Sequence, residues 1–292
     1  MAKPVIAVSG KNGQLGSELQ QLVNTLPGFN FVFTDREELD LTDTAAIEHF
    51  FSDHQPAYFI HGGAYTAVDK AETEKELAFA INATATGVIA AQCKIYNTVL
   101  IYISTDYVFN GGSHLPYEPD EKPDPLNHYG YTKLVGEQMA MENNVHTMVI
   151  RTSWVYSTYG QNFVKTMLRL MKERTDISVV SDQYGSPTYA ADLAKVIIDI
   201  IKYCTIHPPV RGIYHYSNEG NISWYEFAVT IQQMAHLTCN VHAITTDQYP
   251  TPARRPVYTV MDKQKIQSVF GVQLKNWQVS LKECIEKLLQ SA

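Results

Sequence analysis

The sequence predicts an α/β fold in which a Rossmann-type, doubly wound parallel sheet is joined to a smaller, partly interwoven α/β lobe. Strand-like apolar runs alternate with segments of helical periodicity through the first half of the 292-residue chain, as in parallel sheets covered by helices on both faces. The apolar runs lack a regular polar–apolar alternation, as expected for strands that are buried on both faces. A glycine-rich turn follows the first of these runs.

The first half of the chain supplies the predicted sheet and its helices. Each predicted strand is a short apolar run, and each predicted helix is a longer segment with apolar residues at helical spacing. The predicted strands are 4–10, 30–35, 57–63, 98–104 and 146–153. The predicted helices are 14–25, 43–53, 74–96 and 131–143. We therefore expect an NAD(P)-binding Rossmann domain over residues 1–152.

The pattern is less regular beyond residue 152, where short strands mix with helices and proline-rich turns. The predicted strands are 177–182, 212–217 and 240–246. The predicted helices are 160–173, 190–203, 223–237 and 278–290. We expect residues 153–292 to form the smaller, substrate-binding lobe, with segments near 190–217 returning to the first sheet.

The composition argues against nucleic-acid and membrane partners. The net charge is −7 and no block of basic residues occurs, whereas both kinds of partner require clustered positive charge. The sequence has no signal-peptide pattern and no apolar run long enough to span a membrane. Its four cysteines are widely spaced, which favours reduced thiols and no metal site. We expect a cytoplasmic protein that binds a small molecule.

The turn "VSGKNGQLGSEL" places Gly10, Gly13 and Gly16 between the first predicted strand and the first predicted helix. Glycines at such a turn allow backbone N–H groups to approach a pyrophosphate closely. A glycine-rich turn without a ligand is the alternative, because a glycine pattern alone is weak evidence. The strand–helix context favours a dinucleotide site.

The residues after the second predicted strand bear on the choice of cofactor. A carboxylate at Asp35 suits the ribose hydroxyls of NAD and repels the 2′-phosphate of NADP. The next residue, Arg36, could neutralise that phosphate, so the pair does not choose between NADH and NADPH. A solvated turn acid is the alternative for Asp35. Asp40 and Leu41 extend toward the position that an adenine would occupy.

Four polar residues are candidates for the chemistry. Thr105 and Asp106 end the fourth predicted strand, at the edge where parallel sheets bind ligands. Tyr129 and Lys133 lie one turn apart in the following helix. A lysine ammonium near a phenol lowers the phenol's pKa, and a threonine hydroxyl can hold the reacting oxygen. The set fits acid–base chemistry on a carbonyl beside a nicotinamide; a surface tyrosine and lysine are the alternative.

With these residues in place, the sequence resembles the extended short-chain dehydrogenase/reductases. The likeness runs the whole length and includes "GKNGQLG", "AYTAVDKAE", "STDYVF", "YGYTKLVGE", "RTSWVY" and "DQYGSPT". It is strongest to the members that reduce the C4 carbonyl of dTDP-4-dehydro-L-rhamnose to give dTDP-L-rhamnose for cell-surface polysaccharides. The resemblance implies this function, a nucleotide-sugar substrate and NADPH or NADH as cofactor, and it is compatible with a homodimer.

The resemblance, together with the arguments above, assigns the residues of the site. The expected catalytic set is Thr105, Tyr129 and Lys133. The expected cofactor-binding residues are Gly10, Gly13, Gln14, Leu15, Gly16, Asp35, Arg36, Asp40, Leu41, Ala64, Tyr65, Thr66, Tyr129 and Lys133. The expected substrate contacts are Thr105, Asp106, Trp154 and Arg255.

Some of these residues, and others outside the set, have a plainer alternative. Trp154 could be a core aromatic. Arg254 and Arg255 could clamp a diphosphate or lie in a solvated loop. Asn82 could position the nicotinamide or be a buried amide. The segment "IHGGA" departs from the Asn-Ala-Ala-Ala usual in the family, and we expect His61 to be packed rather than catalytic.

Other functions remain beside reduction. The related nucleotide-sugar 4,6-dehydratases carry a glutamate where this chain has Tyr107, and a tyrosine is a poor base for their C5 proton, so a dehydratase is disfavoured. An epimerase uses the same tyrosine and lysine and stays open. A non-catalytic NADP-binding protein, resembling the regulatory subunit of methionine adenosyltransferase, also stays open.

Overall fold

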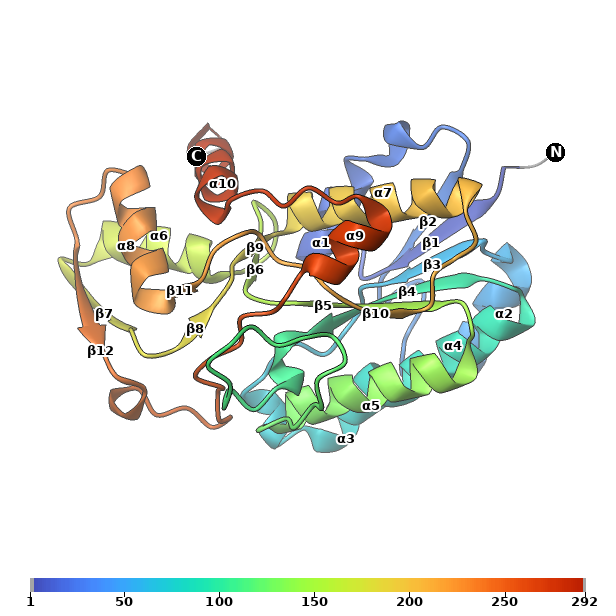
Figure 1. Ribbon diagram of the computed structural model, residues 1–292, viewed down its shortest axis with the longest axis horizontal. Coiled ribbons are helices and arrows are strands. Elements are labelled where there is room, and N and C mark those ends of the chain that lie inside the picture. The colour runs from blue at the N-terminus through green and yellow to red at the C-terminus, as the bar shows by residue number, and fades with distance from the viewer. Residues whose placement is uncertain (1–2, 291–292) are drawn as a thin grey trace.

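A six-stranded parallel sheet forms the centre of the computed structural model, which describes residues 3–290 (Figure 1). Its strands are β1 (Val5–Ser9), β2 (Asn30–Thr34), β3 (Tyr58–His61), β4 (Val99–Thr105), β5 (Thr147–Thr152) and β10 (Gly212–His215). They lie in the order β10-β5-β4-β3-β1-β2. The chain runs outward from β1 to β2 and then crosses back to β3. The switch point between β1 and β3 is where such sheets bind nucleotides.

Helices cover both faces of this sheet, which confirms the doubly wound α/β fold. One face carries α1 (Gln14–Gln20), α7 (Ala190–Ile206) and α9 (Gln264–Phe270), whose apolar residues pack against β1, β3, β4 and β5. The other face carries α2 (Thr44–His54), α4 (Ala85–Ile95) and α5 (His128–Asn143). Because both faces are covered, the inner strands β1, β3, β4 and β5 are almost continuously buried, as the sequence pattern indicates, whereas the edge strands β2 and β10 are less so.

The second half of the chain forms most of a smaller lobe, at the left of Figure 1. Its helices α6 (Phe163–Glu173), α8 (Trp224–Met234) and α10 (Trp277–Gln290) enclose a separate apolar cluster. Its paired strands are β7 (Asp176–Val180) with β12 (Asn240–Ile244), β6 (Val155–Tyr156) with β9 (Thr188–Tyr189), and β8 (Tyr184–Gly185) with β11 (Ile222–Ser223). From the same half of the chain, α7 and β10 lie against the first sheet.

Polar residues at the helix starts explain where several helices begin. The side chain of Asn127 accepts a hydrogen bond from the backbone of Gly130 at 2.8 Å and starts α5. Ser223 and Glu226 form a reciprocal capping box that starts α8. Such caps satisfy backbone N–H groups that have no partner within the helix. The cap on α5 matters most for the site, because this helix carries Tyr129 and Lys133.

The predicted helix over 74–96 is divided into three pieces. These are α3 (Lys75–Phe79), a π-helical turn (Ala80–Thr84) and α4. In the turn, the carbonyl oxygen of Asn82 accepts hydrogen bonds from the hydroxyls of Thr86 and Tyr102, at 2.8 and 3.2 Å. These contacts satisfy a carbonyl at the point where the regular hydrogen-bond ladder is interrupted.

Other differences from the predicted elements are smaller. The helix predicted over 14–25 ends at Gln20 and is followed by a 3₁₀ turn at Val23–Thr25. The short helix α9 and the two-residue strands of the smaller lobe were not predicted. Elements of this length contain too few residues to show a periodicity.

Candidate active site

A cavity of about 630 Å³ lies at the carboxyl ends of β1, β3, β4 and β5. The glycine turn after β1 lines one part of it, and the residues after β4 and at the start of α5 line another. The predicted site residues that line it are Gly10, Gly13, Gln14, Leu15, Gly16, Asp35, Ala64, Thr66, Thr105, Asp106, Tyr129, Lys133 and Trp154. Residues from most of the predicted motifs therefore meet in one place.

The glycine turn has no room for side chains at two positions. Gly10 has a φ of +81°, in the region that favours glycine. A Cβ atom on Gly16 would lie 2.2 Å from the carbonyl oxygen of Gly10. Both glycines are therefore required by the geometry of the turn, which leaves its backbone open to the cavity.

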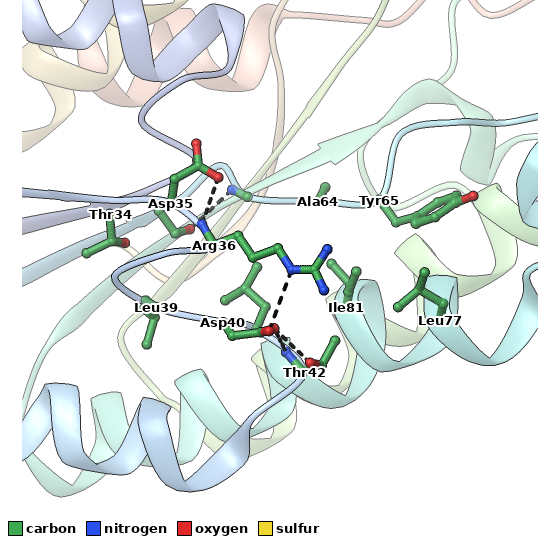
Figure 2. A pocket seen from close by; sticks show the side chains of 14 residues that line it. Thr34, Asp35, Arg36, Leu39, Asp40, Thr42, Ala64, Tyr65, Leu77 and Ile81 are labelled. Atoms are coloured by element: carbon green, nitrogen blue, oxygen red, sulfur yellow. Dashed lines mark hydrogen bonds and ion pairs between the residues drawn. The ribbon is translucent and has the colours of Figure 1, made fainter.

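A second cavity, of about 280 Å³, adjoins the glycine turn at the end of β2 (Figure 2). Asp35, Arg36 and Asp40 lie along it, and Leu77 and Ile81 line it from the helical segment after β3. Of the predicted cofactor residues, Leu41, Ala64 and Tyr65 also line it. Its polar edge and apolar walls suit a ribose and an adenine ring.

The charged side chains along this smaller cavity already have partners within the protein. One oxygen of Asp35 accepts a hydrogen bond from the backbone of Asn12 at 3.0 Å and the other from the backbone of Arg36 at 2.9 Å. The guanidinium of Arg36 lies 3.6 Å from Asp40, and its side chain is 84% exposed. Hydrogen bonds from Thr42 lower the pKa of Asp40. Arg36 is therefore held at the rim by one weak, exposed ion pair, which a phosphate could replace.

The three predicted catalytic residues line the main cavity together, from β4 and α5. Thr105 ends β4, where its hydroxyl donates to Asp106 at 3.1 Å and accepts from the backbone of Tyr107 at 3.2 Å. The ammonium of Lys133 donates to the carbonyl oxygen of Ile103 at 2.7 Å and lies 4.1 Å from the centre of the Tyr102 ring. These two contacts with β4 hold Lys133 in place at the wall of the main cavity.

The expected effect of Lys133 on the pKa of Tyr129 is not found. Burial raises the pKa of Tyr129 to about 12, although a hydrogen bond from Thr105 opposes the shift. Burial also lowers the pKa of Lys133 to about 7. The expectation was wrong because burial is the largest contribution to the pKa of Tyr129, and the ammonium of Lys133 is bonded to the Ile103 carbonyl oxygen. The phenol thus stays protonated at neutral pH, as a proton donor must.

Asp106 presents a carboxylate oxygen with no partner among the described residues. One oxygen is bonded by Thr105, whereas the buried Oδ2 has no partner within residues 3–290. Burial raises the pKa of this carboxyl to about 6, although the neighbouring hydroxyls of Thr259 and Thr105 oppose the shift. Asp106 belongs to the wall of the main cavity, so a carboxylate oxygen without a partner in this part of the chain lies close to it.

Trp154 stands in the wall of the main cavity but is partly used for packing. Its ring stacks on Trp224 with centres 3.5 Å apart and planes inclined by 11°. Its φ of +47° is unusual for a bulky residue and marks local backbone strain. Trp224 covers one face of the ring, so only the rest of the ring can contact a ligand. Packing therefore applies to this residue, and its contact with a substrate stays a prediction.

A third cavity, of about 440 Å³, lies in the smaller lobe beside the main one. Aromatic residues from four separate segments line it: Tyr107, Phe163, Trp224 and Tyr249. Tyr107 also lines the main cavity, and its ring meets that of Tyr129 edge-on at 5.8 Å. The sequence does not indicate a site here, because the residues of this cavity form no local pattern.

Arg255 lines the third cavity, but it is not the free clamp that the sequence suggests. Its guanidinium makes two hydrogen bonds to the carboxylate of Asp69, at 3.0 and 2.8 Å. Asp69 also accepts a hydrogen bond from the backbone of Ala253. This pair connects the loop after β3 to a loop of the smaller lobe, and only part of the guanidinium remains for a ligand. Arg254 is exposed.

Asn82 is a buried amide, and His61 is a packed side chain. Asn82 is 1% exposed, and its amide bonds the backbone of Tyr65 and the hydroxyl of Thr132. His61 is also 1% exposed and does not line the main cavity. Neither side chain is placed to touch a ligand directly.

Two further features of residues 3–290 bear on the function. No helix in this part of the chain has the length and apolar character needed to cross a membrane. The same residues contain no cluster of histidine, cysteine and acidic side chains suited to a metal ion.

The sequence matches the RmlD substrate binding domain family over residues 4–290. It is 37% identical to a dTDP-4-dehydrorhamnose reductase of Aggregatibacter actinomycetemcomitans, over 95% of this chain and 97% of that protein. It is 38% identical to the enzyme of the same name from Escherichia coli K12, over 97% of each chain.

Solved structures give the same result. A dTDP-4-dehydrorhamnose reductase of Bacillus anthracis in complex with NADP has a TM-score of 0.92 and 39% identity, covering 98% of this chain and 100% of that one. A UDP-glucose 4-epimerase of Thermus thermophilus in complex with NAD has a TM-score of 0.81 at 17% identity, covering 99% and 100% of the chains. The epimerase is similar in fold alone.

Proposed function

The chain belongs to the RmlD substrate binding domain family, and from this premise we propose that it reduces dTDP-4-dehydro-L-rhamnose to dTDP-L-rhamnose. The reductant is NADPH or NADH, and the reaction turns the C4 carbonyl of the sugar into a hydroxyl. The observation that carries the proposal is the single cavity in which the glycine turn continues into Thr105, Tyr129 and Lys133. A dinucleotide and a carbonyl compound can meet there.

The cofactor follows the edge of the sheet in this proposal. Its adenosine half occupies the cavity of Asp35 and Arg36, its pyrophosphate faces the backbone of the glycine turn, and its nicotinamide reaches the main cavity. The residues assigned to it are Gly10, Gly13, Gln14, Leu15, Gly16, Asp35, Arg36, Asp40, Leu41, Ala64, Tyr65, Thr66, Tyr129 and Lys133. The fit rests on the missing side chains at Gly10 and Gly16 and on the cations and carboxylates at the rim.

The chemistry needs one hydride and one proton. When bound, the reduced nicotinamide supplies the hydride that adds to C4 of the sugar. Tyr129 donates the proton to the C4 oxygen, and its raised pKa keeps that proton available at neutral pH. The hydroxyl of Thr105 orients and polarises the carbonyl oxygen. Lys133 binds the ribose hydroxyls and returns a proton to Tyr129 after turnover.

The sugar nucleotide spans two cavities in this proposal. The sugar ring lies in the main cavity, where Asp106 Oδ2 accepts a hydrogen bond from a sugar hydroxyl and Trp154 borders the ring. The nucleotide lies in the third cavity, whose aromatic residues Phe163, Trp224 and Tyr249 suit a flat base. Arg255 contacts the diphosphate with the part of its guanidinium that Asp69 leaves free.

Oxidation of NADPH in the presence of nucleotide-linked 4-keto sugars tests the proposal. We expect turnover with dTDP-4-dehydro-L-rhamnose and little with nucleotide sugars that have no 4-keto group. Binding of NADPH without turnover on any 4-keto sugar would instead favour the non-catalytic regulatory protein. Interconversion of C4 epimers without net cofactor oxidation would favour an epimerase.

The proposal also includes a homodimer and a cytoplasmic location. The homodimer is compatible with the likeness to the reductases, and the cytoplasmic location comes from the composition and the widely spaced cysteines. Sedimentation of the full chain and fractionation of cells that produce it would test them separately from the catalytic activity.

A further inference from the structure

His61 ends β3 in a fully enclosed position between elements that border the cofactor cavities. Its ring is 1% exposed and stacks on Tyr102 with centres 5.4 Å apart. Each ring nitrogen has one hydroxyl partner. Nδ1 lies 2.8 Å from Ser9 Oγ and Nε2 lies 3.1 Å from Thr86 Oγ1.

These contacts assign the direction of every hydrogen bond around the ring. The hydroxyl of Thr86 donates to the carbonyl oxygen of Asn82 at 2.8 Å, so Thr86 must accept from Nε2–H of His61. The other nitrogen, Nδ1, then carries a lone pair and accepts from the hydroxyl of Ser9. Ser9 in turn accepts from the backbone N–H of Gly63 at 3.1 Å. The chain of bonds runs in one direction from Gly63 to Asn82.

The ring is neutral, as this chain of bonds requires. Burial lowers the pKa of His61 to about 3, and the charge of Lys133 contributes in the same direction. The ring therefore keeps one proton over the physiological range and cannot reverse the pattern by gaining a second.

The two ends of the chain of bonds belong to different parts of the site. Gly63 and Ser9 line the cavity assigned to adenosine, and Gly63 also lines the main cavity. At the other end, Asn82 holds the backbone of Tyr65 and the hydroxyl of Thr132, in the helix that carries the catalytic residues. Two loops that border the cofactor are thus connected through one imidazole ring.

The glycines beside His61 fit this arrangement. A Cβ atom on Gly63 would lie 3.3 Å from the Ser9 hydroxyl and 3.0 Å from the side chain of Leu41. The absence of a side chain at Gly63 leaves room for Ser9 to reach both its N–H group and the histidine. Ser9, His61 and Gly63 therefore form one consistent set.

We propose that His61 is a positioning residue for the dinucleotide, which fixes the loop at Gly63 relative to the turn at Asn82 through Ser9 and Thr86. The inference rests on the NAD(P)H site of the proposed function but not on the identity of the sugar. In this role His61 does not contact a ligand itself. It requires that loss of the two hydrogen bonds weakens dinucleotide binding more than it weakens sugar binding.

The direct test is to measure the Kd of NADPH for His61→Phe by fluorescence titration. Phenylalanine keeps the buried flat ring against Tyr102 and removes both hydrogen bonds. We expect the Kd to rise about five- to tenfold, which corresponds to the net contribution of one or two hydrogen bonds. The Kd of dTDP should stay within about twofold of the wild-type value, because neither His61 nor its hydrogen-bond partners line the third cavity.

Thr98→Val is the matched control. Thr98 is equally buried and its hydroxyl donates to the carbonyl oxygen of Pro56 at 2.6 Å, at the amino end of β4 and away from the cavities. This variant should lower the Tm without changing the Kd of NADPH. A His61→Phe variant that lowers the Tm alone, as this control does, overturns the proposal.

Two further measurements separate positioning from packing, including the case in which His61→Phe fails to fold. Ser9→Ala removes one link and leaves the ring, and it should raise the Kd of NADPH about two- to fivefold. His61→Asn keeps an acceptor near the place of Nδ1 and should lie nearer to the wild type than His61→Phe. Spectra of isotope-labelled histidine should show a neutral Nε2–H ring between about pH 5 and 8. An unchanged Kd in Ser9→Ala, or an Nδ1–H ring, overturns the proposal.

Discussion

The two halves of the ligand site are built by different means. The half assigned to the cofactor consists mostly of short continuous segments that follow strands of one sheet, and residues without side chains, Gly10, Gly16 and Gly63, form part of its wall. The half assigned to the sugar nucleotide consists of large side chains, such as Trp154 and Trp224, from segments that lie far apart in the chain. The first half is therefore a property of the sheet edge, whereas the second depends on how the smaller lobe packs against it.

This difference has a consequence for function. Substitutions in the half made of side chains should change the affinity for the sugar nucleotide and leave the cofactor bound. Substitutions at the rim of the cofactor half should change the choice of cofactor and leave the sugar bound. Tyr129, the proposed proton donor, lines the main cavity where the halves meet, so loss of its hydroxyl should lower the rate far more than either affinity.

The largest expected effect is that of Tyr129→Phe. Removal of the proton donor should lower kcat about 100- to 10,000-fold, with the Kd of NADPH and the KM of the sugar nucleotide nearly unchanged. Tyr131→Phe is the control, because Tyr131 lies in the same helix and is 47% exposed. Steady-state kinetics of both variants provide the measurement. A near-normal kcat in Tyr129→Phe would remove this residue from the chemistry.

Trp154→Ala should have the next largest effect. Loss of the ring should raise the KM of the sugar nucleotide about 10- to 200-fold and leave the Kd of NADPH unchanged. Trp277→Ala is the control for packing, since Trp277 is 6% exposed in the core of the same lobe and its loss should cost about 3–5 kcal/mol of stability. If Trp154→Ala lowers the Tm as Trp277→Ala does and leaves the KM unchanged, Trp154 only packs.

The pH dependence of sugar binding should follow Asp106. Its ionised carboxylate accepts a hydrogen bond from the sugar, and its pKa of about 6 means that the acceptor is lost as pH falls through 6. We expect kcat/KM for the sugar nucleotide to fall about tenfold per pH unit below that value. Asp106→Asn should lower kcat/KM and remove this dependence. A profile that is flat between about pH 5 and 7 in the wild type would contradict the assignment.

The contribution of Asp106 to stability has the opposite sign. Its pKa is raised from the ordinary value of 3.8 to about 6 in the folded chain, so the folded state holds the proton more tightly than the unfolded state. The stabilisation is complete below the lower value and is lost as pH rises through the higher one. Stability and sugar binding should therefore change in opposite directions between these two values.

Arg36→Ala should have the smallest effect. The guanidinium is 84% exposed, so its attraction to a 2′-phosphate is screened, and the preference for NADPH over NADH should fall about two- to fivefold. Arg169→Ala is the control, because Arg169 is also exposed and forms the same kind of i,i+4 ion pair, with Glu173. An unchanged ratio of the two kcat/KM values in Arg36→Ala would mean that Arg36 does not contact the cofactor.

The parts of the site that the sequence predicts are those set by local rules. The ends of the strands can be predicted from the apolar runs, and this prediction places Thr105 and Asp106 at the carboxyl end of β4. Tyr129 and Lys133 share a helical face because of their spacing. The glycine turn is recognisable because a strand and a helix flank it. Each of these inferences needs only the neighbouring residues and the rule that parallel strands expose their carboxyl ends at one edge.

The parts that the sequence does not predict depend on contacts between distant segments. Arg255 is paired with Asp69, 186 positions away, and no pattern in the neighbouring sequence predicts this partner. The π-helical turn depends on hydroxyls from Thr86 and Tyr102 that reach the Asn82 carbonyl. The raised pKa of Tyr129 depends on burial, which only the assembled cavity determines. Packing and desolvation, rather than spacing, decide these features.

The fate of a labelled hydride tests the central claim most directly. Reduced cofactor that carries deuterium at the transferred position of the nicotinamide is incubated with the full chain and dTDP-4-dehydro-L-rhamnose, and the sugar product is examined by mass spectrometry and NMR. The account predicts deuterium at C4 of dTDP-L-rhamnose, with the hydroxyl proton drawn from solvent through Tyr129. A product without deuterium at C4, or deuterium that stays on the cofactor while the sugar is unchanged, would contradict it.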